Sequence, residues 1–493
     1  MKIVLFALNG SYSHTNLAIR CLRPHLEAAG FDTVLVENSL KDRDSHVLRR
    51  LYGERADIYA FSTYIWNARQ MQALAKRLKI LMPQAITVFG GPEVSFETER
   101  YDDCDFMDFI LLGEGESTLP ALCSALRDRG VASVRAEYGR VIGAGDLGTD
   151  NSHHVMGDEG VLYRQTDKNA PLFYYESSRG CPYSCAYCLS SATSGVRAKS
   201  VEQTLRDLRA FEGFAEECKV VKFVDRTFNF DIARANAIWS AILSDEFTLT
   251  YHFEICVSLL NEESFKILSR FPKGKLQLEV GLQSTNPETL SAVSRHISAD
   301  KVISATKRLR DMENIDVYLD LIAGLPHEDL QSFKRSFDAA YFAPTILQVG
   351  FLKLLPGTAL RRDSEKYGYV FCDEPPYTVL QSKWISYAEL ELLHSVHEVM
   401  ERYCESGGFE STLDYVMPRV GSPFDFWSGF CTFLSTAADG RVIQKISQPD
   451  AYRYMSAYLQ EIAADWELDI DIAREYLRRD FEYREHKRAP FGI

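Results

Sequence analysis

Three cysteines on one short segment are the residues whose types and spacing most directly indicate chemistry. Cys181, Cys185 and Cys188 lie in the run SRGCPYSCAYC, directly after a segment that we expect to be a strand. Three thiolates on one loop can ligate three irons of a [4Fe–4S] cubane and leave the fourth iron open to another ligand. A structural zinc site would need a fourth Cys or His nearby, and this loop has none. The spacing therefore predicts a site-differentiated [4Fe–4S] cluster, with buried structural thiols as the alternative.

The elements that must position this loop alternate between strand and helix from residue 171 onward. We expect six strands, at 172–177, 220–225, 251–257, 275–282, 317–323 and 346–354. Six βα units predict a partial (β/α)6 barrel rather than a complete eightfold one. In barrels of this type the chemistry lies at the carboxyl ends of the strands, and the cysteine loop follows the first strand.

The N-terminal part of the chain shows the same alternation. Strands are expected at 2–8, 32–37, 58–63, 86–90 and 109–112. Short strands separated by helices predict a parallel, doubly wound (Rossmann-like) sheet, whose ligands lie beyond the carboxyl ends of the strands. The fold class is therefore α/β, with a Rossmann-like domain over 1–130, a linker over 131–170, the partial barrel over 171–368 and a mainly helical C-terminal cap over 369–493.

The spacing C-x3-C-x2-C, with Tyr187 before the last cysteine, resembles the radical S-adenosylmethionine (SAM) superfamily. In that superfamily the open iron binds SAM, and one electron cleaves SAM to methionine and a 5′-deoxyadenosyl radical that abstracts hydrogen from the substrate. The resemblance implies that Cys181, Cys185 and Cys188 are metal ligands and catalytic residues. It also implies an electron donor of the ferredoxin or flavodoxin type.

Polar residues at the other expected strand ends are candidates to bind SAM. Asp225 ends the second strand, where the superfamily usually holds the methionine amino group, and Glu254 lies in the third strand. Gln283 and Ser284 follow the fourth strand, in a run that resembles the ribose contact of related enzymes. Tyr187 is a further candidate cofactor contact. A structural role is the alternative for each of them.

A doubly wound domain ahead of this barrel resembles the cobalamin-binding domain of class B radical SAM enzymes. Small residues at its strand ends would let a large, flat ligand approach the backbone. The residues that the resemblance implies as cobalamin contacts are Ser62, Thr63, Gly90, Gly91, Glu114 and Gly115. The first loop departs from the family pattern D-x-H-x-x-G, because Tyr12 stands two residues before His14. His14 is therefore a candidate cobalt ligand that lacks the usual supporting Asp.

Two other uses of the N-terminal domain fit the sequence less well. The first turn lacks a G-x-G-x-x-G run and the chain lacks a G-x-x-x-x-G-K-[ST] loop, which argues against a nucleotide site. A second iron–sulfur cluster, as in methylthiotransferases, would need Cys21, Cys104 and Cys123 as ligands. Cys21 and Cys123 fall on expected helices, away from the strand ends.

Composition limits the partners that the protein can have. The chain has 55 Lys and Arg against 69 Asp and Glu, a net charge of −14, which argues against broad binding to nucleic acid or anionic membranes. No run approaches the roughly 18 apolar residues of a membrane-spanning helix, and the N-terminus lacks the features of a signal peptide. We expect a cytoplasmic protein whose eleven cysteines are thiols or metal ligands.

Together these patterns predict a cobalamin-dependent radical SAM enzyme. The expected reaction is methylation of an unactivated carbon in an unknown small molecule or peptide. A radical rearrangement or cyclisation without methyl transfer is one alternative, and a cobalamin-binding sensor or carrier with a structural cluster is another. Arg179, beside the cysteines, is a candidate to attract a carboxylate or phosphate group, with solvation as its alternative.

Overall fold

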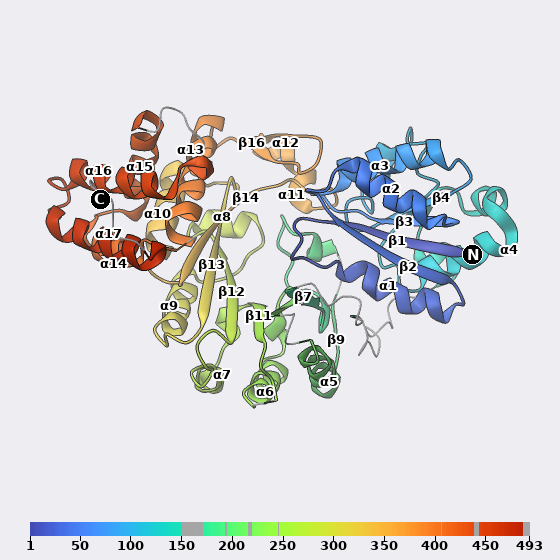
Figure 1. Cartoon of the computed structure of the whole chain (residues 1–493), viewed down its shortest axis with the longest axis horizontal. Coiled ribbons are helices and arrows are strands. Elements are labelled where there is room, and N and C mark those ends of the chain that lie inside the picture. Colours follow the sequence, from blue (N-terminus) through green and yellow to red (C-terminus); the bar gives the residue numbers. More distant parts are fainter. Residues whose placement is uncertain are drawn as a thin grey trace. The chain divides into compact units, whose positions relative to one another are not determined.

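A computed structural model gives the fold of the chain (Figure 1). It describes residues 1–149, 163, 171–192, 195–214, 219–244, 246–405, 407–437 and 443–486. The chain forms two compact units. The first comprises Met1–Leu278, Lys353–Ser364 and Cys372–Thr378, and the second comprises Glu279–Leu352, Glu365–Phe371 and Val379–Ile493.

The first unit begins with a six-stranded parallel sheet. Its strands are β1 (Lys2–Asn9), β2 (Asp32–Ser39), β3 (Ile58–Ser62), β4 (Ile86–Gly90), β5 (Phe109–Leu111) and β6 (Val141–Ile142). The strand order is β2-β1-β3-β4-β5-β6 and every pairing is parallel. The direction of winding reverses between β1 and β3, and ligands of open parallel sheets bind beyond the carboxyl ends of strands at such a point.

Helices cover both faces of this sheet (Figure 1). They are α1 (Leu17–Ala28), α2 (Asp44–Glu54), α3 (Ala68–Leu81) and α4 (Thr118–Tyr138). Strand β1 is buried on both sides: Val4 and Phe6 pack with α2 and α3, while Ile3 and Leu5 pack with α1 and α4. A strand that is buried on both faces reads as a continuous apolar run, which is why KIVLFAL identified it. The expected doubly wound domain is confirmed.

The expected linker over 131–170 differs from the structure in its first part. Helix α4 continues to Tyr138 across a kink at Gly130, where φ is +75°, and β6 then adds a strand to the sheet. The short 3-10 turn Ala144–Leu147 follows. A two-residue strand is too short to show a period, and the kink hides the helix, so neither was apparent from the pattern. His153 and His154 lie outside the described residues.

A second six-stranded sheet corresponds to the expected partial barrel. Its strands are β7 (Leu172–Tyr175), β10 (Val220–Phe223), β11 (Thr250–Ile255), β12 (Leu276–Gln283), β13 (Asp316–Ala323) and β14 (Ile346–Phe351). Their order is β14-β13-β12-β11-β10-β7, and the pairings of β7 with β10, β10 with β11 and β13 with β14 are parallel. All six strands lie in sequence order, which confirms the expected α/β fold class.

Helices alternate with these strands. In the first unit they are α5 (Val201–Glu212), α6 (Ile232–Ile242) and α7 (Glu262–Leu268); in the second they are α8 (Pro287–Ala292), α9 (Ala299–Arg310) and α10 (Leu330–Ala340). Local capping sets where several begin. The Ser200 side chain caps α5 together with Gln203, and Asp231 accepts hydrogen bonds from the first turn of α6.

No described helix is long and apolar enough to cross a bilayer.

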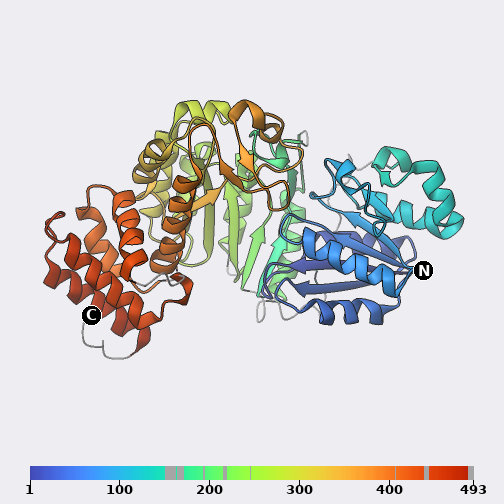
Figure 2. The ribbon, with the colours of Figure 1, turned by 90° about the horizontal axis from the view of Figure 1, so that it is seen from above.

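The C-terminal region is helical, as expected (Figures 1 and 2). Its main helices are α13 (Tyr387–Met400), α14 (Glu410–Val416), α15 (Pro423–Ala437), α16 (Gln448–Ile462) and α17 (Ile470–Glu485). It packs against α10 of the same unit: the Asp338 carboxylate accepts hydrogen bonds from Ser422 Oγ at 2.7 Å and from the Phe424 N–H at 2.8 Å. The Trp427 indole N–H donates to the Tyr341 hydroxyl at 3.1 Å. That this region caps the barrel stays a prediction.

Gly91, directly after β4, provides a test of how tightly the first sheet is packed at its carboxyl edge. Its φ is +110°, and a Cβ there would lie 2.5 Å from the carbonyl oxygen of Thr63. Gly30 also has a positive φ, +83°, but a Cβ there would meet nothing within 4 Å. We expect Gly91→Ala to lower the free energy of unfolding by about 2 kcal/mol more than Gly30→Ala. Denaturant midpoints measure the difference, and equal losses would contradict the close approach.

Candidate active site

The cysteine loop lies between two short strands of the first unit. Strands β8 (Ser178–Gly180) and β9 (Val196–Ala198) pair in antiparallel fashion. Gly180 has φ of +102°, and a Cβ on it would overlap the carbonyl oxygen of Gly195. Only glycine fits this position. The glycine that precedes Cys181 in the sequence is therefore required by the hairpin.

The three thiols have the chemistry that an iron–sulfur cluster needs. Cys185 is buried and Cys181 and Cys188 are partly exposed, and all three carry thiols rather than disulfides. The Cys188 N–H donates to the Cys185 carbonyl at 3.0 Å, which forms a turn between them. Cys181 Sγ lies 3.5 Å from Thr227 Oγ1. Three soft donors on one partly open loop fit a cubane cluster.

A single metal ion would need a different arrangement. Within the described part of the chain, no three or more His, Cys, Asp or Glu side chains are grouped so that they could hold one metal ion. A cubane does not require this, because each cysteine ligates a different iron. The donor set therefore fits a cluster in number and chemistry.

Asp225, at the end of β10, is fully buried beneath this loop. Its carboxylate accepts hydrogen bonds from the Ser177 N–H at 2.7 Å, Ser177 Oγ at 2.5 Å and Ser178 Oγ at 2.6 Å. Arg234 on α6 donates to Ser177 Oγ at 2.9 Å and to the Ser177 carbonyl at 3.2 Å. Burial raises the pKa of Asp225, although the hydrogen bonds oppose that shift.

These contacts give Asp225 a supporting role, and its contact with SAM stays a prediction. Both of its oxygens are bonded to the segment that leads from β7 into the cysteine loop, so its role is to hold that segment in place. The sequence placed Asp225 at a strand end, but it could not show which groups surround the carboxylate.

Asn229 is a second support that sequence reasoning missed. Its side chain accepts a hydrogen bond from the Cys256 N–H at 2.8 Å and donates to the Cys256 carbonyl at 2.9 Å. It thereby joins the segments that follow β10 and β11. The Tyr183 hydroxyl, on the cysteine loop, donates to Cys256 Sγ at 3.2 Å. Glu254 on β11 remains partly exposed, 3.8 Å from the Arg226 guanidinium.

The second unit contains the other two predicted SAM contacts. Ser284 is buried and donates to Glu328 Oε1 at 2.6 Å, which gives it a structural contact, and its contact with SAM stays a prediction. Gln283 differs: it has φ of +75°, and its buried Oε1 has no hydrogen-bond partner in the described part of the chain. An unpaired acceptor at a strand end fits contact with a ligand hydroxyl or amino group.

The predicted cobalamin contacts of the first sheet lie at its carboxyl edge. Ser62 ends β3, and the Thr63 N–H donates to the Gly90 carbonyl at 2.8 Å. A Cβ on Gly90 would meet nothing within 4 Å, so the end of β4 is open to a ligand. Asn67, which the sequence did not single out, fixes the loop after β3 by donating to the carbonyl groups of Leu8 at 3.2 Å and Ser62 at 3.1 Å.

His14 lies in the loop after β1, where its exposed ring contacts Tyr174 of β7. His14 Nδ1 is 3.0 Å from the Tyr174 hydroxyl. Burial, and to a smaller degree the positive charge of Lys222, lower the pKa of His14. The ring is therefore neutral at physiological pH, as a metal ligand must be. With Nδ1 engaged, Nε2 is the nitrogen that remains for a cobalt ion.

Arg179 does not lie open to a ligand, contrary to the hypothesis from sequence. Its guanidinium forms ion pairs with Glu114 at 2.8 Å, Glu116 at 2.7 Å and Glu176 at 2.8 Å. Burial opposes ionisation of Glu116, yet Arg179 lowers its pKa overall. Glu114 also pairs with Arg197. Glu114 therefore pairs with two arginines, and its contact with cobalamin stays a prediction.

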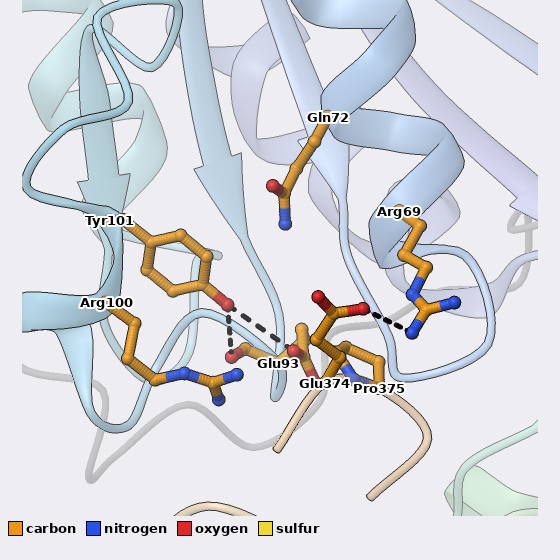
Figure 3. Close-up of a pocket in the computed structure, with 7 residues that line it drawn as sticks. All are labelled: Arg69, Gln72, Glu93, Arg100, Tyr101, Glu374 and Pro375. Atoms are coloured by element: carbon orange, nitrogen blue, oxygen red, sulfur yellow. Dashed lines mark hydrogen bonds and ion pairs between the residues drawn. The ribbon is translucent and has the colours of Figure 1, made fainter. Parts of the chain in front are cut away.

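A polar cavity of about 390 Å³ lies elsewhere in the first unit (Figure 3). Its lining residues are Arg69, Gln72, Glu93, Arg100, Tyr101, Glu374 and Pro375. Glu93 is 2% exposed and accepts hydrogen bonds from the Tyr101 and Tyr377 hydroxyls. Burial raises the pKa of Glu93. No pattern in the sequence indicated this cavity, because Glu374 and Tyr377 are far from Glu93 along the chain.

The fold and the cysteine loop define a class. A doubly wound domain precedes a six-stranded parallel sheet whose first strand leads into three cysteines, which is the arrangement of a radical SAM protein with an N-terminal cofactor-binding domain. Family models agree: "Radical SAM superfamily" matches residues 175–340, "B12 binding domain" matches 3–123 and "Protein of unknown function (DUF4080)" matches 365–491. The chain thus combines a B12-binding domain with a radical SAM domain, as the cobalamin-binding (class B) radical SAM enzymes do.

Curated relatives match more than half of the chain. The chain is 27% identical over 355 residues to the hopanoid C-3 methylase of Methylococcus capsulatus, covering 69% of this chain and 67% of that protein. It is 29% identical over 342 residues to the cobalamin-dependent radical SAM methyltransferase TokK of Streptomyces tokunonensis, covering 63% of this chain. The match spans 49% of TokK, about half its length.

Solved structures share the fold. The methyltransferase TsrM from Kitasatospora setae, with cobalamin and a [4Fe–4S] cluster bound, aligns with a TM-score of 0.61 at 15% identity, over 87% of this chain and 97% of TsrM. OxsB with aqua-cobalamin and SAM bound aligns with a TM-score of 0.63 at 14% identity, over 98% of this chain and 83% of OxsB. The matched domains give the chain its cofactors, a [4Fe–4S] cluster, SAM and cobalamin.

Removing one acceptor oxygen from Asp225 tests its supporting role. Asp225→Asn places an amide N–H₂ opposite the donors of Ser177 and Ser178. Because two donors then face each other, we expect the free energy of unfolding to fall by about 3 kcal/mol. We also expect a lower iron content after reconstitution. Asp231→Asn is the matched control, because Asn caps a helix as well as Asp does. Unfolding midpoints and iron analysis measure both effects. Wild-type stability in Asp225→Asn would leave its carboxylate available to SAM instead.

Glu328 makes the stability of the second unit depend on pH. Burial raises its pKa from 4.5 to about 7, so the folded chain holds a proton that the unfolded chain releases between these values. Stability therefore falls as pH rises through this window, by on the order of 3 kcal/mol. Glu328→Gln mimics the protonated acid and should remove this dependence.

The measurement is the unfolding midpoint at pH 5 and pH 8. Glu288→Gln is the control, because the Glu288 side chain is 80% exposed and its loss should leave the pH dependence unchanged. Identical pH profiles for wild type and Glu328→Gln would contradict the raised pKa.

Proposed function

We propose that this protein is a cobalamin-dependent radical SAM enzyme that methylates an unactivated carbon of a small molecule or peptide. The observation that carries the proposal is the three-cysteine loop within the same compact unit as a B12-binding domain. The names of the hopanoid C-3 methylase and TokK support methyl transfer as the reaction.

In this proposal Cys181, Cys185 and Cys188 hold the cluster. When bound, the cluster and SAM supply hydrogen-atom abstraction, and cobalamin supplies a transferable methyl group. The residues of the chain orient these groups. Two side chains contact SAM: Gln283, whose Oε1 is a buried acceptor, and Glu254. Tyr187 lies beside the last cysteine.

The cobalamin site is proposed at the carboxyl edge of the first sheet. Ser62, Thr63, Gly90, Gly91 and Gly115 form it, with the open space at Gly90 supporting close approach of a flat ligand. His14 Nε2 is the proposed nitrogen ligand to cobalt. A corrin spectrum distinguishes nitrogen-ligated cobalt from cobalt with a water at that position, which tests the assignment to His14.

The remaining partners follow from the chemistry. One electron is needed for each cleavage of SAM, and a ferredoxin- or flavodoxin-type protein is the proposed donor. The cytoplasmic location stays a prediction. A sensor or carrier is disfavoured because such a protein needs no iron that is open to SAM, whereas the loop offers only three thiolate ligands.

Reductive cleavage of SAM tests the enzyme. Protein reconstituted with iron and sulfide, then given SAM and dithionite, should form 5′-deoxyadenosine. Cys185→Ala should reduce this product to the level of protein without iron, whereas Cys372→Ala, which changes an exposed cysteine outside the loop, should keep it. Absence of 5′-deoxyadenosine from wild-type protein with an intact cluster would contradict the proposal and favour the sensor or carrier.

Methyl transfer needs a separate experiment. Protein loaded with hydroxocobalamin should retain corrin absorbance after desalting. Added to cell extract with SAM that has a deuterated methyl group, it should increase the mass of one compound by one CD3 group less the hydrogen that this group replaces. A product of unchanged mass would instead identify a rearrangement or cyclisation.

A further inference from the structure

Five charged side chains of the first unit form a cluster between the B12-binding domain and the cysteine hairpin. Arg179 and Arg197 come from β8 and β9, Glu176 follows β7, and Glu114 and Glu116 follow β5. We call this group the arginine–glutamate cluster. Its side chains are between 11% and 31% exposed, so solvent screens their interactions only in part.

The two arginines lie directly opposite each other. In the antiparallel pairing of β8 with β9, the partner of Arg179 is Arg197. Like charges at opposed positions of an antiparallel pair destabilise it. Strand β8 has only three residues, Ser178–Gly180, so few other backbone pairs hold the hairpin together.

One carboxylate is shared by both arginines. Glu114 Oε2 is 2.8 Å from Arg179 Nη1, and Glu114 Oε1 pairs with Arg197. Glu116 adds a second carboxylate of the same loop, 2.7 Å from Arg179 Nη2. The repulsion within the hairpin is therefore offset by charges that belong to a different domain. Glu176, which is close in sequence, pairs with Arg179 alone.

We propose that Glu114 and Glu116 are positioning residues for the iron–sulfur cluster: through Arg179 and Arg197, the B12-binding domain holds the hairpin in the form that retains iron. This inference rests on the proposed function in one respect, that the three cysteines bind a cluster. It explains why Glu114, which the sequence predicted to contact cobalamin, forms an ion pair with Arg179, two residues before Cys181.

The rate at which a chelator removes iron from reconstituted full-length protein tests the inference. Glu114→Gln removes the shared charge, and we expect iron loss about tenfold faster than in wild type, within the range of couplings between contacting charges. Arg197→Gln removes the like-charge pair and should keep the wild-type rate. The double variant Glu114→Gln/Arg197→Gln should return close to wild type, a rescue that general loss of stability would not produce.

Glu54→Gln is the matched control, because the Glu54 side chain is 26% exposed, close to the 24% of Glu114, and forms an ion pair with Lys2 at the amino end of β1 in the same unit. It should leave iron loss unchanged. Equal rates for wild type and Glu114→Gln would overturn the inference, as would a double variant that loses iron as fast as Glu114→Gln. If Glu114→Gln does not fold, rapid iron loss from the double variant overturns it as well. Failure of wild-type protein to take up any cluster would refute the proposed function instead.

Discussion

The buried carboxylate of Asp225 is the constraint on which the site depends. A charge removed from water must be compensated by hydrogen bonds, and here the donors are the backbone and hydroxyl of Ser177 and the hydroxyl of Ser178. These are the residues that lead from β7 to the cysteines. Arg234 reaches the same Ser177 from α6. The route of the chain into the cysteine loop is therefore set by one carboxylate on the neighbouring strand.

The polar residues at the strand ends divide into two groups. The side chains of the first group, Asp225, Ser284 and Asn229, form hydrogen bonds within the protein and thereby hold loops in place. The buried Oε1 of Gln283 has no hydrogen-bond partner among the described residues, which is typical of an acceptor that contacts a ligand. Rigid supports matter at a cofactor site, because a flexible support would misplace the cofactor.

Electrostatics extends this dependence to the domain before the barrel. Arg179 and Arg197 are opposed on a hairpin with little backbone pairing, and Glu114 lies between them. The domain that binds cobalamin and the loop that binds iron are therefore linked by charge. Within the second unit, the helical C-terminal region packs on α10 through aromatic contacts and hydrogen bonds to Asp338.

The sequence by itself determined the fold class and the six barrel strands and predicted the iron ligands, because periodicity and cysteine spacing are local properties of the chain. It also identified the resemblance to class B radical SAM enzymes. It missed β6 and the β8–β9 hairpin, whose two or three residues show no period. Only the tertiary structure showed which protein groups surround the strand-end residues, and it gives Asp225, Ser284 and Glu114 supporting contacts. The reason is physical: the role of a polar group depends on which donors and charges surround it, and those come from residues tens of positions away in the chain.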